Sequence, residues 1–349
     1  MAIYRDGYLF VDNSTLSAFK TCKMQAMMKY GYNLQPAEQR NTPAFIGTCL
    51  HKALEQYFIT EDPANAFRTL HAEYWEYAQT HVAPDDRTSR YDNIYLVLES
   101  WIRRNPPNQW PFKVSNADHV EMPFAIPLPG APNIIYCGAL DLIVQRADLA
   151  DVFYVYDTKS TGRPDDRFRA QFDLGSQFSG YVWAAQQIVS PNVVGAYVNI
   201  VHRMVIPTST GKCRSGHGTT YDVCGYLHPQ HELKPVMRTP AEIEAWLLDA
   251  TMIAIQWYEY FTEFIGDGSE ADVADITMVP QDGKWGYQVC PLCDYKDFCH
   301  ANRPVNDAQH SFEQIEWKPG PFAYESDTER IDIDDLLSNP LYSGRHTPW

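Results

Sequence analysis

The chain has 349 residues, and its apolar and charged fractions of 45% and 21% are typical of a soluble globular protein. The length permits one elaborated domain or two smaller ones, and the lack of a signal pattern or of a bilayer-spanning apolar run predicts a cytoplasmic protein with no membrane partner. A formal net charge of −16 argues against nonspecific nucleic-acid binding over the whole surface, but it leaves room for a local basic groove.

The first third of the chain is predicted to be helical. The pattern of residues 12–32 begins with N-cap candidates at Asn13 and Ser14, and it ends near Gly31. Its lysines make this helix basic within an acidic chain. Three further helices are expected, over residues 43–59, 64–80 and 90–104.

The character of the sequence changes after residue 118. Runs rich in Val, Ile, Tyr and Phe predict strands at 118–127, 133–146, 151–160, 193–206 and about 219–228. Helices are expected over residues 170–190 and 240–265. Residues 305–349 form an acidic tail broken by Pro and Gly, which is expected to be loosely ordered or to cover another surface. This order predicts an α/β fold of the mixed α+β kind.

Three cysteines lie close together in the run VCPLCDYKDFCH, at Cys290, Cys293 and Cys299. Disulfides are rare in the cytosol, so clustered cysteines there are better interpreted as metal ligands. Soft thiolates select zinc or an iron–sulfur cluster. Cys22 on the first helix is the candidate fourth ligand, which would staple the two ends of the chain together.

Two acidic residues and a lysine form the constellation that carries chemistry. Asp141 lies in CGALDLIV, and Asp157 and Lys159 lie in VYDTKST. A hairpin turn centred on residue 149 would set Asp141 roughly opposite Asp157, about 5 Å apart, with Lys159 on the same face. Two such carboxylates repel each other unless a cation such as Mg²⁺ or Mn²⁺ lies between them. The alternative is an Asp–Lys salt bridge on a solvated strand.

Other residues have both structural and functional interpretations. His51 lies on the second predicted helix, and Gln177 and Tyr181 lie one turn apart on a later one; each is commonly a packing residue. Glu121 is expected to support the sheet rather than to act directly. Cys49 and Cys137 sit in apolar patterns and are expected to be buried.

The order of these motifs, His, then G-x-x-D, then D-x-K, then Q-x-x-x-Y, resembles the PD-(D/E)XK nuclease superfamily in its RecB-like branch. The cysteine spacing is similar to that of the iron–sulfur members of the branch, which include CRISPR-associated adaptation exonucleases and AddB-type nucleases. The resemblance spans roughly residues 14–300. Two positions depart from the pattern: Lys23 replaces a frequent proline, and Asp157 stands where many relatives carry glutamate.

The resemblance implies a restriction-endonuclease-like core, with a central mixed sheet flanked by helices, over about residues 43–210. This core would lie in one domain spanning residues 1–304, whose N- and C-terminal helical parts are joined by the metal cluster. A [4Fe–4S] cluster would be held by four thiolates, Cys22, Cys290, Cys293 and Cys299.

The resemblance also assigns roles around the catalytic metal, Mg²⁺ or Mn²⁺. Its implied ligands are His51, Asp141, Asp157 and the backbone carbonyl of Thr158. Lys159 would act on the attacking water or the scissile phosphate. Gln177 and Tyr181 would position Lys159 or the DNA backbone. Candidate DNA contacts are the nearby basic side chains Lys20, Lys23, Arg163, Arg167 and Arg169. A second metal site at Cys213, His217 and Cys224 is a weaker hypothesis, because only three ligands are visible there.

The leading hypothesis is a metal-dependent DNA exonuclease that hydrolyses phosphodiester bonds from single-stranded or duplex ends and carries a structural [4Fe–4S] cluster. The alternatives are an endonuclease or RNA-directed nuclease of the same fold, and a non-catalytic DNA-binding or assembly module with a zinc site. No Walker A motif is present, so a helicase or recombination motor would be a separate partner. A prokaryotic cell or a phage-infected host is the expected setting.

Overall fold

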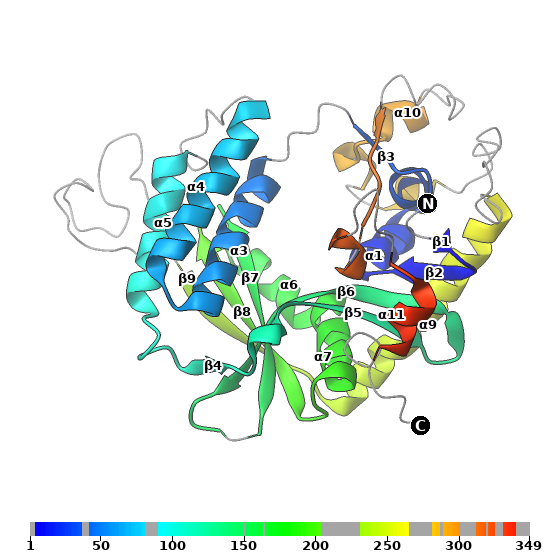
Figure 1. The fold of residues 1–349 in the computed structure, drawn as a ribbon. Coiled ribbons are helices and arrows are strands. Elements are labelled where there is room, and N and C mark those ends of the chain that lie inside the picture. The colour runs from blue at the N-terminus through cyan, green and yellow to red at the C-terminus, as the bar shows by residue number, and fades with distance from the viewer. Residues whose placement is uncertain are drawn as a thin grey trace.

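The computed structural model describes residues 4–36, 42–80, 90–149, 151–162, 165–203, 231–264, 281–286, 289–300, 312–318, 320–324 and 331–339. Within these residues, an eight-stranded sheet forms the centre of the fold (Figure 1). Its strands are β1 (Tyr4–Arg5), β2 (Tyr8–Val11), β4 (Phe112–Val114), β5 (Val120–Leu128), β6 (Ala131–Arg146), β7 (Phe153–Thr161), β8 (Val193–His202) and β9 (His231–Met237).

The long strand β6 organises this sheet. One edge of β6 pairs with β5 and β4, and the other edge pairs with β2 and β7. The strand order β1-β2-β6-β7-β8-β9 combines antiparallel pairs with two parallel ones, β2–β6 and β7–β8. The predicted mixed sheet is therefore confirmed.

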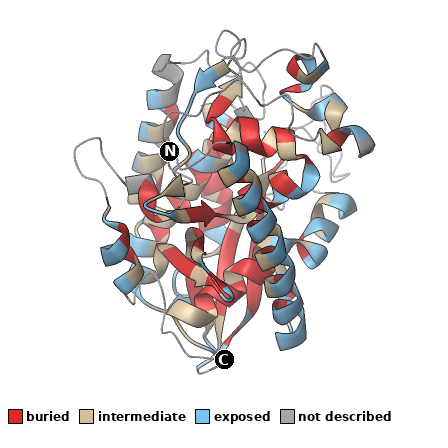
Figure 2. Cartoon of the chain, turned by 90° about the vertical axis from the view of Figure 1, so that its right-hand side faces the viewer, coloured by how far each residue is buried: buried red, intermediate tan, exposed pale blue. Residues whose placement is uncertain are grey.

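Helices cover both faces of the sheet, as predicted. On one face, α3 (Thr42–Thr60), α4 (Pro63–Thr80) and α5 (Tyr91–Arg104) pack side by side (Figure 1). On the other face lie α1 (Asn13–Thr21), α7 (Ser176–Ile188) and α9 (Pro240–Phe264). Successive side chains of β7 point to opposite faces of the sheet. Val155 packs in the core on the side of α1, α7 and α9, whereas Tyr156 contacts Phe58 of α3 on the other side. Figure 2 shows the buried residues concentrated in the sheet and on the inward faces of the helices.

Two predicted helices are interrupted. The helix predicted over residues 12–32 is broken at Cys22, where the backbone is extended. The break separates α1 from α2 (Lys23–Ala26), which is followed by a π-helical turn over Met27–Gly31. The second is split at Gly175 into α6 (Asp166–Leu174) and α7. A Cβ at Gly175 would lie 2.7 Å from the carbonyl oxygen of Gln171, so glycine permits this tight connection.

The two ends of the chain meet beside the sheet. Strand β10 (Phe312–Gln314) pairs antiparallel with β3 (Leu34–Pro36), and the Tyr295 hydroxyl donates to the Leu34 carbonyl at 2.6 Å. The Lys23 ammonium lies 2.8 Å from an Asp282 carboxylate oxygen. We call these contacts the terminal junction. They join the N- and C-terminal parts by direct protein contacts.

Part of the acidic tail covers the sheet. In α11 (Ile333–Ser338), Ile333 and Leu336 are buried in a small core with Phe10 and Phe322. The predicted strand at 219–228 lies outside the described residues, and β9 is a strand that the sequence pattern did not indicate. None of the helices in the described ranges is long and apolar enough to cross a bilayer.

Candidate nuclease site

The β6–β7 hairpin brings Asp141 and Asp157 to neighbouring positions. The paired register runs through Val144–Tyr154 to Leu142–Tyr156, so one further step places Asp141 opposite Asp157. This agrees with the turn position predicted from the sequence. The Asp157 side chain is fully buried, and that of Asp141 is 13% exposed. Burial of two facing carboxylates is costly unless positive charge accompanies them.

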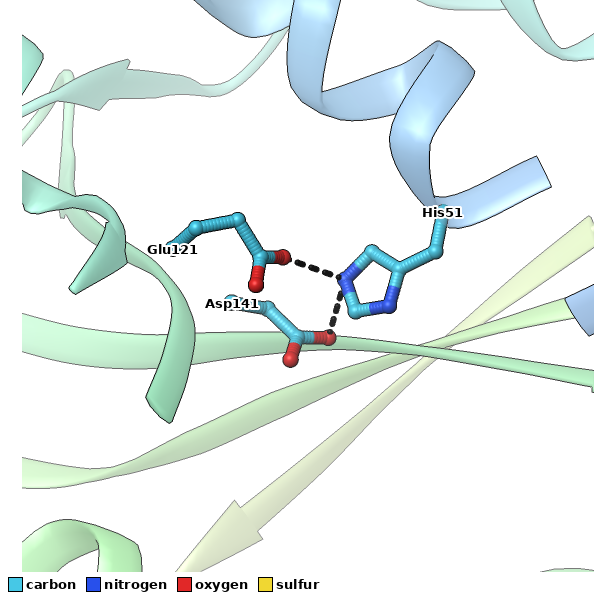
Figure 3. Close-up of side chains that lie close together, drawn as sticks. All are labelled: His51, Glu121 and Asp141. Atoms are coloured by element: carbon cyan, nitrogen blue, oxygen red, sulfur yellow. Dashed lines mark ion pairs between the residues drawn. The ribbon is translucent and has the colours of Figure 1, made fainter. Parts of the chain in front are cut away.

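Three side chains from three elements converge beside this hairpin (Figure 3). The Nε2 atom of His51, on α3, lies 2.9 Å from Asp141 Oδ2 and 3.0 Å from Glu121 Oε1. One ligand atom of each residue falls within 4.8 Å of the other two, and no other such group of three occurs among the described residues. Imidazole nitrogen and carboxylate oxygens suit a divalent cation such as Mn²⁺. We call His51, Glu121 and Asp141 the acidic triad.

Glu121 was expected to support the sheet, and its place in the acidic triad was not predicted from the sequence. The pairs Val120–Leu142 and Met122–Leu140 place it across from Asp141, and its backbone has φ +49. A left-handed conformation is rare for a non-glycine residue, and it turns this side chain toward His51. A lone charge inside the apolar run VEMPFAI was the available signal.

The electrostatics of the acidic triad favour a charged histidine when no metal is bound. Burial opposes the charge, but Asp141 and Glu121 outweigh it and hold the pKa of His51 well above its ordinary value. Burial likewise raises the pKa of Asp141, but His51 and Lys159 more than offset it and the pKa is lowered. A bound cation would take the place of the histidine proton, because a metal ligand must be deprotonated.

Asp157 and Lys159 form a separate ion pair next to the acidic triad. The Lys159 ammonium lies 2.8 Å and 2.7 Å from the two carboxylate oxygens of Asp157. Burial raises the pKa of Asp157 to about 6, against the opposing effect of Lys159 and with a further increase from Asp141. The salt bridge that was the alternative interpretation thus exists, but its carboxylate is fully buried, its lysine is 31% exposed, and it borders a histidine–carboxylate group.

Thr158 links the acidic triad to the Asp157–Lys159 ion pair, because it lies between Asp157 and Lys159 and its backbone N–H donates to Asp141 Oδ2 at 2.8 Å.

The predicted pair Gln177 and Tyr181 lies on α7, where Gln177 Nε2 donates to the Tyr181 hydroxyl at 3.0 Å. Burial, followed by the charges of Asp157 and Asp141, raises the pKa of Tyr181 well above its ordinary value, so its hydroxyl stays protonated. Gly180 allows α7 to approach β6 and α9 closely, since a Cβ there would clash with the Tyr136 hydroxyl and lie 2.7 Å from the ring of Trp246.

The predicted DNA contacts differ in their surroundings. Lys20 and Arg167 are exposed. Lys23 pairs with Asp282, and Arg169 forms an ion pair with Glu232 at 2.6 Å, so both already carry structural contacts. Arg163 lies outside the described residues. Their contact with DNA stays a prediction.

The four predicted cluster ligands line one pocket of about 360 Å³. Cys22 is buried, and Cys290, Cys293 and Cys299 are half-buried. Gly283 permits close approach here, because a Cβ on it would lie 2.9 Å from Val289 Cγ1 and 3.3 Å from the Cβ of Cys22. Burial, with the nearby thiols, raises the pKa of Cys299 to about 11. No three of these sulfurs lie within 4.8 Å of one another.

The remaining cysteines divide into two groups. Cys49 and Cys137 are buried, as predicted, with exposures of 0% and 1%. The weaker candidates for a second metal site, Cys213, His217 and Cys224, lie outside the described residues.

A mixed sheet that carries a histidine–carboxylate group beside an Asp–Lys pair is the arrangement that the resemblance of the sequence implied. Residues 13–300 match the model of the PD-(D/E)XK nuclease superfamily, and the chain belongs to that superfamily. A solved structure from Eubacterium rectale, described as "Putative exonuclease", is similar with 12% identity and a TM-score of 0.46, over 94% of this chain and 93% of that one. No curated protein matches the chain.

Proposed function

We propose that the protein is a divalent-metal-dependent DNA exonuclease of the RecB-like branch, which hydrolyses phosphodiester bonds from DNA ends. The observation that supports this best is the placement of the acidic triad beside the Asp157–Lys159 pair, whose carboxylate is fully buried. A purely structural salt bridge does not require a second carboxylate pair and a histidine next to it. The fit of the residues to Mg²⁺ or Mn²⁺ rests on donors of the kinds these ions bind.

Each residue has a distinct task in this proposal. His51, Glu121 and Asp141 hold the cation, and Asp157 and the carbonyl of Thr158 complete its surroundings. When bound, the cation supplies an activated water and neutralises charge on the phosphate. Lys159, kept charged by Asp157 and Asp141, stabilises the negative charge that develops on the phosphate oxygens.

We further propose that Cys22, Cys290, Cys293 and Cys299 hold a [4Fe–4S] cluster. The four cysteines line one pocket although Cys22 lies far from the other three in sequence. Their soft sulfur donors are of the kind that iron–sulfur clusters select.

The test of function uses the full chain, purified anaerobically, with end-labelled linear DNA, covalently closed circular DNA and RNA in the presence of Mn²⁺ or Mg²⁺. We expect shortening of linear DNA from its ends, loss of this activity in Asp141→Asn, and unchanged activity in Asp148→Asn. Asp148 is the matched control, because it is an exposed carboxylate on the turn of the same hairpin, paired with Arg146.

The other outcomes identify the alternatives. Cleavage of circular DNA as fast as linear DNA would establish an endonuclease, and preference for RNA would establish an RNA-directed enzyme. A colourless anaerobic preparation with stoichiometric zinc and no cleavage would establish the non-catalytic module. The cytoplasmic location and a separate helicase or recombination partner stay predictions.

A further inference from the structure

We infer that Asn199 is a positioning residue of the metal site, acting through Thr158 on Asp141. Asn199 lies on β8, is 1% exposed and is remote in sequence from every motif of the family pattern. Its side chain belongs to a hydrogen-bonded chain that runs from α5 to the acidic triad. The inference rests on the proposed function, because it assigns the task of ordering the metal ligand Asp141.

The orientation of the Asn199 amide is fixed by its partner on α5. The indole nitrogen of Trp101 is a donor only, and it lies 3.0 Å from Asn199 Oδ1 in a buried contact. The amide oxygen must therefore face Trp101, and the amide nitrogen must face the other way. There it donates to Thr158 Oγ1 at 3.3 Å.

Thr158 transmits this constraint to the site. It lies between Asp157 and Lys159, and its N–H donates to Asp141 Oδ2, the oxygen that also contacts His51. A shift of Thr158 therefore moves both the carboxylate of the acidic triad and the two residues of the ion pair.

The hairpin geometry explains why this segment needs support from β8. The paired register of β6 with β7 ends at Leu142–Tyr156, so the Asp157–Lys159 segment lies beyond the last pair on that edge. Its neighbour on the other edge is β8, where Thr158 pairs directly with Asn199. The side-chain bond from Asn199 thus acts at the point where β7 leaves β6.

The test compares Mn²⁺ binding, measured from the electron paramagnetic resonance of free Mn²⁺, in three variants. Asn199→Leu removes the amide, and Thr158→Val removes the hydroxyl while keeping the N–H that Asp141 accepts. Asn93→Leu is the matched control, a buried asparagine on α5 that donates to the Arg203 carbonyl instead. Melting temperature and cluster absorbance report whether each variant folds.

We expect the Mn²⁺ dissociation constant to rise about 10-fold or more in Asn199→Leu and Thr158→Val, the range found when outer partners of metal ligands are removed. The double variant should be no weaker than the poorer single variant, because both changes interrupt one path. Asn93→Leu should stay within about 2-fold of the wild type, since it leaves that path intact. If Asn199→Leu does not fold, Thr158→Val still decides.

Two results would overturn the inference alone: a folded Asn199→Leu or Thr158→Val that binds Mn²⁺ as the wild type does, or an equal loss of affinity in Asn93→Leu. A different result would overturn the proposed function itself, namely a wild-type protein whose Mn²⁺ affinity does not change in Asp141→Asn.

Discussion

Replacement of Lys159 by methionine should make the stability of the protein depend on pH in a new way. In the wild type, burial raises the pKa of Asp157 from 3.8 to about 6 despite the lysine. At 1.36 kcal/mol per pKa unit, ionised Asp157 costs the metal-free fold about 3 kcal/mol. A group with a raised folded pKa contributes its full stability below the unfolded pKa and loses it as pH rises through the folded pKa. In the wild type this loss is complete above about pH 6.

Lys159→Met removes the cation that stabilises the ionised carboxylate of Asp157, so the pKa of Asp157 rises further. The variant therefore continues to lose stability above pH 6, until the pH reaches this higher pKa. The free energy of unfolding of the variant should fall below that of the wild type by about 1.4 kcal/mol for each pH unit above 6. At pH 5 Asp157 is protonated in both proteins, so the substitution removes no ion pair and the difference in stability should be small.

The assay is the melting temperature from pH 5 to pH 8 in buffer free of divalent cations. The gap should widen by roughly 2–4 °C per pH unit above 6. Lys113→Met, at an exposed position of β4, controls for loss of a positive charge and should show no such trend. A gap that stays constant over this range would refute the argument that Lys159 sustains the charge of Asp157.

Four further outcomes are expected. Lys159→Ala should bind DNA nearly as tightly as the wild type in a filter-binding assay while its turnover falls about 100-fold. Glu121→Gln should weaken Mn²⁺ binding about 10-fold by calorimetry, whereas Glu55→Gln, in the pocket beside His51 but outside the acidic triad, should change it little. Because the pKa of His51 is raised, Mn²⁺ affinity should increase about tenfold per pH unit near neutrality, and His51→Ala should abolish this slope. Cys22→Ser should lose the broad absorption near roughly 400 nm and lower the melting temperature, since closing a long loop stabilises the fold.

The hairpin at the centre of the site could be predicted from the sequence because its turn chemistry and strand patterns fix the register. The only polar break between two apolar runs lies midway between Asp141 and Asp157, and a shift by one residue would expose the buried face of either strand. The helical position of His51 followed from an ordinary amphipathic pattern.

The side-chain convergence at Glu121 could not be predicted in the same way. Strand alternation assumes extended dihedral angles, and a residue at φ +49 breaks that rule locally. The helix break at Cys22 was also missed, because its neighbours are good helix formers and the extended backbone there reflects tertiary contacts. Asn199 carries no local signal, since its role depends on partners from α5 and β7.

The terminal junction has a consequence for the order of events on the ribosome. All residues of the acidic triad and the Asp157–Lys159 pair precede residue 203, yet the terminal junction needs Asp282, Tyr295 and β10, which are synthesised much later. Synthesis of the segment from residue 203 to the last clustered cysteine takes on the order of 10 s. Throughout that interval the nascent chain contains the acidic triad and the Asp157–Lys159 pair but lacks the terminal junction. A chain released by interrupted translation would therefore lack the contacts that join its N- and C-terminal parts, and β3 would be left without its partner strand.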